Sequence, residues 1–291
     1  MSPQPSRKKR HVQVYAFVDT NIFLDFYRAS NDATLKTLSR LEPVKDRLIS
    51  TYQVEMEFLK NRQRVLLDSL TQVKSPPSIS LPAIFATTAT STSLRTLGKE
   101  AGKKASLLRN RIVKLLGSPR QNDVVYQALV GVFQSESEHV LTRDMPERRS
   151  IRRKAARRFL LGYPPRKKSD TSIGDAMNWE WIVYCASRFP GKLVIVSRDS
   201  DYGVEVNGKY FLNDQLREEL RDRAGKKSVK YTHRLTDALH ELKVHVPAQE
   251  LQAETEAMQP LTPATESGTR RIRAEMEEII RQLLDETQSS E

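Results

Sequence analysis

The sequence predicts an α/β protein with a Rossmann-like, three-layer arrangement of helices around a parallel central sheet. Two apolar runs rich in β-branched residues, 14–18 and 193–197, each lead into an aspartate. Buried parallel strands end in this way at the edge of an open sheet, where ligands bind. Strand and helix patterns also alternate along much of the chain, and parallel strands need crossover helices of this kind.

The first part of the chain supplies two strands and two helices, placed by apolar periodicity and by breaking residues. Residues 12–18 form the first strand, and residues 22–41 form a helix that Pro43 ends. Residues 48–51 form a short second strand, followed by a long helix over 52–70. The Pro-, Ser- and Thr-rich residues 75–92 are expected to be a loop.

The second part begins with a helical stretch, residues 93–161, which has breaks at Gly117–Pro119 and at Pro146 and no strand signal. We therefore expect a helical insertion within the α/β domain. After it the periodicity predicts a helix over 173–187, a strand over 193–197, a helix over 213–223, a short strand over 229–231 and a helix over 235–242.

The two ends of the chain differ from the domain between them. Residues 1–11 form a basic arm, residues 12–246 the domain, and the Pro-, Gln-, Glu- and Thr-rich residues 247–268 a linker. In residues 269–291 apolar side chains recur at the spacing of an amphipathic helix. We expect this C-terminal helix either to pack on its own domain or to bind a partner: an antitoxin, another protein or a second copy of the chain.

The composition argues against a membrane span and a disulfide framework. No apolar run approaches the roughly 20 residues that a membrane span requires. The basic N-terminus is not followed by an apolar stretch with a cleavage site, so no secretory signal is expected. Cys185 is the only cysteine, which excludes an intramolecular disulfide and indicates a reducing compartment. We therefore expect a cytoplasmic protein.

Positive charge is concentrated in clusters, and the formal net charge is +12. Such a surface is typical of nucleic-acid binding, because neutralising phosphates releases their counterions. A solvated helix face is the alternative explanation. The residues that we expect to contact a nucleic-acid backbone from these clusters are Arg152, Arg153, Arg157, Arg158, Lys167 and Lys168.

Acidic residues mark three places that this fold would bring to one edge of the sheet. Asp19 follows the first strand, Asp175 opens a Trp-bearing apolar helix, and Asp199 follows the strand at 193–197. Each alone could be a helix cap or a turn residue. Together they would repel one another unless a cation were bound, and Mg²⁺ and Mn²⁺ prefer oxygen ligands. Asp170 and Asp201 are further candidates, each with a turn residue as the alternative.

These motifs resemble those of the PIN-domain nucleases, in family order. Val18-Asp-Thr-Asn21 resembles the opening motif, and Ser197-Arg-Asp-Ser-Asp-Tyr202 resembles the late strand-end motif. The helix at 52–70 looks most like that of a PIN-like branch reading Gln-Val-x-x-Glu-Phe-x-x-Asn-Arg. Gly174-Asp-Ala-Met-Asn-Trp179 is similar to the third motif of that branch, where Pro-Pro and an Asp come shortly before it. The resemblance covers roughly residues 12–75 and 160–245.

The resemblance implies a metal site and an activity. In the family such acids bind metal, so one or two Mg²⁺ or Mn²⁺ ions would be held by Asp19, Glu57, Asp175 and Asp199 for phosphodiester hydrolysis. Residues that would support this site are Thr20, Asn21, Asn61 and Ser197. Arg62 would either contact a backbone phosphate or form a surface ion pair.

The resemblance and the periodicity disagree on one acid. Helical spacing places Glu55 nearer the middle of the apolar face of residues 52–70, whereas the Glu-Phe-x-x-Asn-Arg match selects Glu57. We follow the resemblance, because a site at a sheet edge need not lie on the core face of the helix.

The family usually acts on RNA, so the resemblance implies a metal-dependent ribonuclease of the toxin or antiviral type. The residues themselves favour neither RNA nor DNA. One alternative is a non-catalytic nucleic-acid-binding protein on the same fold, which missing acids would indicate; here all four positions are filled. Another is a phosphohydrolase of the haloacid dehalogenase type. That class needs Asp-x-Asp after the first strand, where this chain has Asp19-Thr-Asn21.

Overall fold

A parallel sheet of five strands, in the order β3-β2-β1-β4-β7, forms the centre of the fold. The computed structural model describes residues 12–29, 31–73, 83–85, 88–166, 172–225 and 228–258. The strands of this sheet are β1 (Val14–Val18), β2 (Leu48–Thr51), β3 (Val140–Leu141), β4 (Lys192–Val196) and β7 (Val229–Thr232). The predicted α/β fold class with a parallel sheet is confirmed.

The two central strands are buried along their length. Every residue of β1 is buried, and β1 pairs with β4 in a continuous register from Val14 opposite Lys192 to Val18 opposite Val196. Such strands are covered on both faces, which explains why their sequences are runs of apolar residues and do not alternate with polar ones. This register brings the residues that follow β1 and β4 to the same edge of the sheet.

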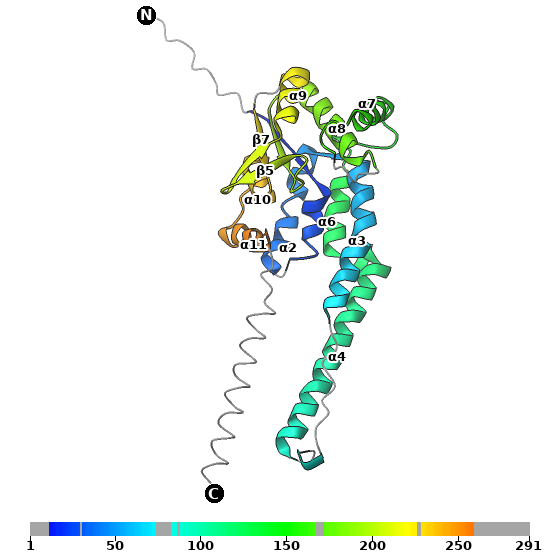
Figure 1. The fold of residues 1–291 in the computed structure, drawn as a ribbon, viewed down its shortest axis with the longest axis vertical. Helices are drawn as coiled ribbons and strands as arrows, with labels where there is room; N and C mark the ends of the chain where they lie inside the picture. The colour runs from blue at the N-terminus through cyan, green and yellow to red at the C-terminus, as the bar shows by residue number, and fades with distance from the viewer. Residues whose placement is uncertain are drawn as a thin grey trace, which may run out of the picture. The chain divides into compact units, whose positions relative to one another are not determined.

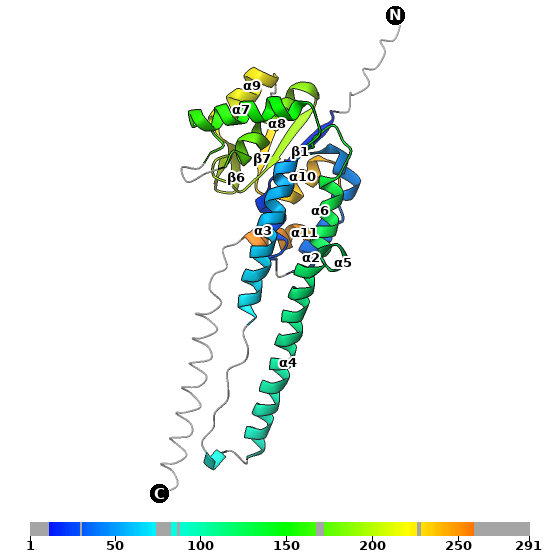
Figure 2. The ribbon, with the colours of Figure 1, turned by 90° about the vertical axis from the view of Figure 1, so that its right-hand side faces the viewer.

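Helices cover both faces of the sheet, as the prediction of three layers requires. On one side lie α7 (Glu147–Leu161), α8 (Gly174–Arg188) and α9 (Asp214–Ala224), with α8 packed against β2 (Figures 1 and 2). On the other side, α10 (Leu235–Glu241) contacts β1, β4 and β7, and α6 (Val124–Phe133) contacts β2. The short helix η1 (Glu42–Arg47) packs against α6.

A long helix, α3 (Tyr52–Gln72), starts directly where β2 ends. Its first turn is capped by Thr51, whose hydroxyl accepts hydrogen bonds from the backbone N–H groups of Gln53 and Val54, both at 3.2 Å. Helix α4 (Ala89–Gly117) runs beside α3 and continues past its end, away from the sheet (Figures 1 and 2). Short helical turns precede and follow it at η2 (Ala83–Phe85) and α5 (Pro119–Asn122).

The single helix predicted over residues 22–41 is wrong. The structure has two helices there, α1 (Thr20–Asp25) and α2 (Asp32–Leu38). Asn31 explains the interruption, because its extended backbone and its side-chain oxygen, 2.8 Å from the N–H of Ala33, form a new N-cap.

Three strands were not predicted, β3 and the two strands of a hairpin. Within residues 93–161, where no strand was expected, β3 pairs with β2 through Ser50 opposite Val140. Strands β5 (Gly203–Val206) and β6 (Lys209–Leu212) form an antiparallel hairpin. Its turn, Asn207-Gly208, has positive φ angles of 51° and 73°, which these two residue types adopt readily in tight hairpins.

Helix α11 (Ala248–Met258) occupies residues where the composition predicted a linker. Glu250 accepts two hydrogen bonds of 2.6 Å from the guanidinium of Arg40, and Glu254 accepts one of 2.6 Å from the N–H of Leu235. These contacts anchor α11 to the domain. The predicted basic arm, residues 1–11, and the predicted amphipathic helix, residues 269–291, lie outside the described residues.

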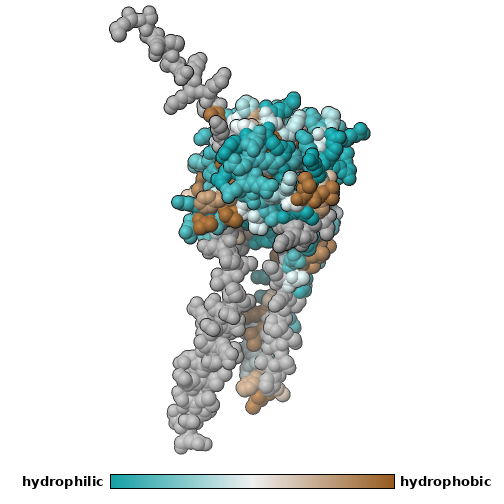
Figure 3. All heavy atoms as spheres, turned by 45° about the horizontal axis from the view of Figure 1, so that its top comes forward, coloured by the Kyte–Doolittle hydropathy of each residue, from teal (hydrophilic) through white to brown (hydrophobic). Residues whose placement is uncertain are grey.

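The surface seen in Figure 3 is mostly hydrophilic, in keeping with the 29% of charged residues in the chain. None of the helices in the described ranges is both long and apolar enough to cross a membrane.

Candidate active site

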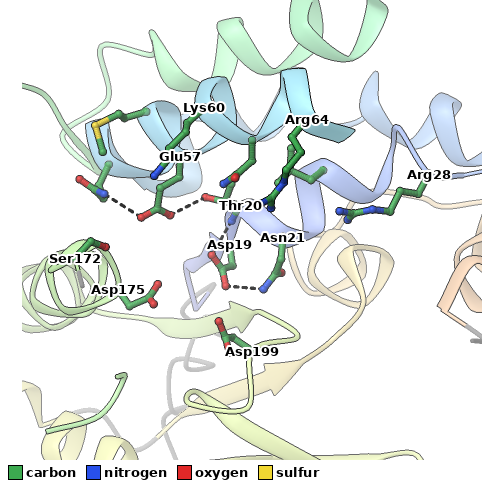
Figure 4. Close-up of a pocket in the computed structure, with 14 residues that line it drawn as sticks. Asp19, Thr20, Asn21, Arg28, Glu57, Lys60, Arg64, Ser172, Asp175 and Asp199 are labelled. Atoms are coloured by element: carbon green, nitrogen blue, oxygen red, sulfur yellow. Dashed lines mark hydrogen bonds between the residues drawn. The ribbon is translucent and has the colours of Figure 1, made fainter. Parts of the chain in front are cut away.

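A pocket of about 460 Å³ opens where β1 and β4 end, beside the first turns of α3 and α8. Four carboxylates line it: Asp19 after β1, Glu57 on α3, Asp175 in the first turn of α8, and Asp199 after β4. Figure 4 shows these carboxylates around a common space. The structure therefore brings together four acids that lie far apart in the sequence.

Asp19 is held in place by hydrogen bonds to both of its carboxylate oxygens. Oδ1 accepts the N–H of Thr20 at 2.7 Å, so Asp19 caps α1. Oδ2 accepts the hydroxyl of Ser197 at 2.5 Å and the amide of Asn21 at 2.9 Å. Because Asp19 follows β1 and Ser197 follows β4, the bond from Ser197 ties the ends of the two central strands together at the pocket.

The surroundings of Asp19 disfavour its negative charge. Its side chain is buried, with an exposed fraction of 4%, and this burial raises its pKa to about 7. The hydrogen bond from Ser197 opposes the rise in pKa, while the negative charges of Glu57 and Asp199 add to it. At neutral pH the pocket therefore holds a carboxylate that a cation would stabilise.

Glu57 approaches the start of α8 closely. Its carboxylate accepts hydrogen bonds from the amide of Gln53 at 2.9 Å and from the hydroxyl of Thr20 at 3.4 Å. A Cβ atom built on Gly174 would lie 2.2 Å from Glu57 Oε1, closer than any real contact. A glycine at this position therefore leaves the space that the Glu57 carboxylate occupies.

The negative charges of the pocket raise the pKa values of two buried tyrosines. Burial raises the pKa of Tyr202 well above its usual value, and Asp175 and Asp19 raise it further. Burial also raises the pKa of Tyr231, with Asp19 and Asp199 adding to the effect. Both phenol groups thus lie within electrostatic reach of pocket carboxylates that come from separate elements.

The predicted supporting residues lie at the pocket. Thr20, Asn21 and Asn61 line it, and Ser197 lies behind it, bonded to Asp19 and accepting the N–H of Asp199 at 3.0 Å. Asp201 is not among the lining residues. Asp170, Lys167 and Lys168 lie outside the described residues.

Two arginines predicted to contact nucleic acid are buried, which corrects that prediction. The guanidinium of Arg62 lies 2.6 Å from Asp123 and is 4% exposed. Arg158 is equally buried and forms ion pairs with Glu180, at 3.0 Å, and with Glu219. In this structure neither side chain is available to a phosphate, because each already neutralises a buried acid.

Sequence reasoning missed several residues of the pocket wall. Three are cations, Arg28, Lys60 and Arg64, and two are polar, Gln53 and Ser172. A signal for two of them was present, since Lys60 and Arg64 follow Glu57 by three and seven residues and so share its face of α3. Arg28 and Ser172 gave no such signal, because only the tertiary fold brings their segments to the pocket.

The donor set suits a hard divalent cation. All four acids offer oxygen ligands, and the pocket also admits solvent, which Mg²⁺ tends to keep in its coordination shell. Within the described residues, no three His, Cys, Asp or Glu side chains are close enough together to enclose a metal ion by themselves.

A family model described as PIN domain matches residues 16–202, which is more than half of the chain. The chain therefore belongs to the PIN-domain family, whose fold is of the nuclease type. No curated protein and no solved structure matches the chain.

Proposed function

We propose that this protein is a Mg²⁺- or Mn²⁺-dependent nuclease that hydrolyses phosphodiester bonds, with RNA as the favoured substrate and DNA as the alternative. The observation that carries the proposal is the convergence of Asp19, Glu57, Asp175 and Asp199 on one pocket of a PIN domain. PIN domains are generally nucleases.

The four acids would hold the cation through their carboxylate oxygens. When bound, the cation would neutralise charge on the phosphate and lower the pKa of an attacking water. The chain's own residues position the ligands: Ser197 and Asn21 fix one oxygen of Asp19, and Gln53 fixes one oxygen of Glu57. Such outer contacts matter because their loss commonly costs about 10–100-fold in metal affinity or activity.

The exposed face of α7 is proposed as a second contact for the nucleic-acid backbone. Arg152, Arg153 and Arg157 are exposed, whereas Ile151 and Ala155 on the opposite face are buried. Each phosphate contact contributes a salt-dependent part of the affinity. Replacing the three arginines by glutamine should therefore flatten the dependence of binding on salt, and an unchanged slope would assign them to a solvated face.

A cleavage assay tests the proposed activity. The purified protein is incubated with single-stranded RNA and with DNA of the same sequence, in Mg²⁺, in Mn²⁺ and in excess chelator. We expect cleavage in either metal and none in chelator, with Asp19→Asn prepared in parallel to reveal a contaminating nuclease. Salt-sensitive binding without cleavage in any metal would support the non-catalytic alternative instead.

A further inference from the structure

We propose that a second pocket, at the edge of the sheet formed by β7, binds a compact polyphosphate, the phosphate chain of a free nucleotide or an inorganic polyphosphate. The pocket has a volume of about 690 Å³ and lies where the β5–β6 hairpin and α10 flank β7 (Figure 1). It shares no lining residue with the pocket of the four acids. The inference therefore does not rest on the proposed nuclease activity.

Four cations line this second pocket, each from a different element. Lys192 is the first residue of β4, Lys209 is the first of β6, Lys230 lies on β7 and Arg234 is the N-cap residue of α10. These positive charges surround one hollow, whereas the exposed arginines of α7 share the face of a single helix. A cleft lined by charges of one sign concentrates ligands of the opposite sign. The arrangement suits a small ligand that carries several negative charges close together.

The acids near these cations do not balance them. Glu241 lies 2.7 Å from the ammonium of Lys192 and 3.3 Å from that of Lys230, so one carboxylate serves two lysines. Among the described residues, Asp237 is the only acid that lines the pocket, and its carboxylate accepts the hydroxyl of Thr232 at 2.6 Å. The pocket therefore keeps more positive than negative charge.

Lys209 and Arg234 carry the charge that remains. Neither forms an ion pair within the described part of the chain, and Glu205 on the neighbouring strand lies 3.2 Å from His233 without lining the pocket. Burial raises the pKa of Tyr210, another residue of the pocket wall, while the charge of Arg234 opposes this rise. The Arg234 guanidinium therefore lies beside Tyr210 at the pocket, where its planar set of N–H groups can bind a phosphate.

The size and position of the pocket favour a small ligand over a nucleic-acid strand. A volume of about 690 Å³ is within the roughly 300–1,000 Å³ typical of sites for small molecules. Lys192 begins β4 and Val196 ends it, so the rise of about 3.3 Å per residue places Lys192 about 13 Å from the strand end beside the acids. Grooves that bind single strands carry cations along the backbone, whereas here they converge on one space.

Binding to the full chain in excess chelator tests the proposal. The probes are inorganic tripolyphosphate, ATP and AMP, titrated by calorimetry at low salt. Without a divalent cation the four acids repel a polyphosphate, so that binding reports the second pocket. We expect tripolyphosphate and ATP to bind with a stoichiometry near one, and AMP about tenfold more weakly because it carries fewer charges. Tighter binding of ATP than of tripolyphosphate would identify a nucleotide as the ligand, and equal binding would identify the phosphate chain alone.

Two pairs of substitutions locate the binding. Lys209→Gln/Arg234→Gln should weaken tripolyphosphate binding at least about tenfold, since even one hydrogen bond to a charged group contributes that much. Lys99→Gln/Arg111→Gln removes the same charges from exposed positions of α4 outside this pocket and should bind like the wild type. Melting temperatures without ligand check the fold. Lys209→Glu, at an exposed position of the hairpin, serves as a second variant and should also weaken binding.

Three results would overturn the inference, and none of them depends on cleavage. The first is an absence of tripolyphosphate binding to the wild type. The second is an equal loss of affinity in the two double variants, which would show attraction to the net positive charge of the chain. The third is an RNA strand with a 5′-hydroxyl end that competes as strongly as tripolyphosphate, which would assign the pocket to a nucleic-acid path.

Discussion

Asp19 shows how one residue can serve the fold and the proposed chemistry together. From the sequence alone, the position of Asp19 after the first strand could be explained by a role as a helix cap or as a metal ligand. In the structure, Oδ1 of Asp19 accepts the capping hydrogen bond, while Oδ2 accepts hydrogen bonds from Ser197 and Asn21 at the pocket. The cap therefore does not argue against a metal site. It fixes the carboxylate in a buried position where its negative charge is unfavourable without a cation.

Glu57 and Glu55 can be separated by a matched pair of substitutions. Glu57→Gln should lower the cleavage rate at least about 100-fold, the order of loss when one charge-stabilising group is removed from an active site. Glu55→Gln should leave the rate unchanged, since Glu55 does not line the pocket. Initial rates at saturating Mg²⁺ measure both. Loss of activity in the Glu55 variant alone would show that the wrong acid has been assigned.

The reason that periodicity favoured Glu55 lies in two residues of α3. Helical spacing places Leu59 on the apolar face of residues 52–70, but its side chain is 42% exposed, whereas Arg62, a charged residue, is buried on the true core face. Apolar spacing could not reveal this exchange, because the burial of Arg62 depends on Asp123, which lies 61 residues further along the chain. The family motif selected the glutamate that the structure has at the pocket.

At the scale of elements, α3 and α8 together form one wall of the pocket. Thr51, at the N-cap of α3, donates its hydroxyl to Asn178 Oδ1 on α8 at 2.6 Å. The starts of the two helices are thereby fixed side by side, with Glu57 in the second turn of α3 and Asp175 in the first turn of α8. Activity should therefore be sensitive to the contact between the starts of these helices.

Gly174→Ala tests this contact. The added methyl group would lie 2.2 Å from Glu57 Oε1 and 2.8 Å from Gln53 Nε2. Both atoms end flexible side chains, so we expect them to move while the helices stay in place. Cleavage should fall about 10–100-fold, as for other losses of ligand positioning, with the free energy of unfolding changed by no more than about 1 kcal/mol.

Gly117→Ala is the matched control, because nothing lies within 4 Å of the Cβ atom that it would add. Rates and thermal denaturation are measured on both variants. If Gly174→Ala cleaved at the wild-type rate, the position of Glu57 would not matter to the reaction.

Elements differed in how well the sequence predicted them. The central strands β1 and β4 were predictable because burial on both faces leaves a long apolar run. Strand β3 was not, since its two residues are too few for any periodicity and it joins the sheet only through β2. The β5–β6 hairpin did carry a signal, Asn207-Gly208, which was overlooked among polar residues.

At the scale of the whole molecule, α11 changes where a truncation should be made. Deleting residues 259–291 keeps Glu250 and Glu254 and should preserve thermal stability and cleavage. Deleting residues 250–291 removes both acids. Arg40 then loses its partner Glu250, and the N–H groups at the start of α10 lose their acceptor Glu254. We expect that deletion to cost at least about 1.5–3 kcal/mol, the contribution of a single hydrogen bond involving a charged group.

Circular dichroism melting and cleavage rates on the two truncated proteins measure the difference. Loss of cleavage in the folded 259–291 deletion would show that the C-terminal segment completes the active site. A partner or self-association role for residues 269–291, including an antitoxin partner, stays a prediction; the shorter deletion should remove such binding and spare the reaction.

The most direct test of the central claim is a Mn²⁺ titration of the wild-type protein and of Asp19→Asn, with cleavage measured on the same samples. The amide is nearly isosteric with the carboxylate, keeps an oxygen for the cap and binds a divalent cation poorly. We predict that the wild type binds Mn²⁺ and cleaves its substrate, and that Asp19→Asn does neither while it melts at a temperature no lower than that of the wild type. Metal binding and cleavage by Asp19→Asn at wild-type levels would contradict a metal site built on these four acids.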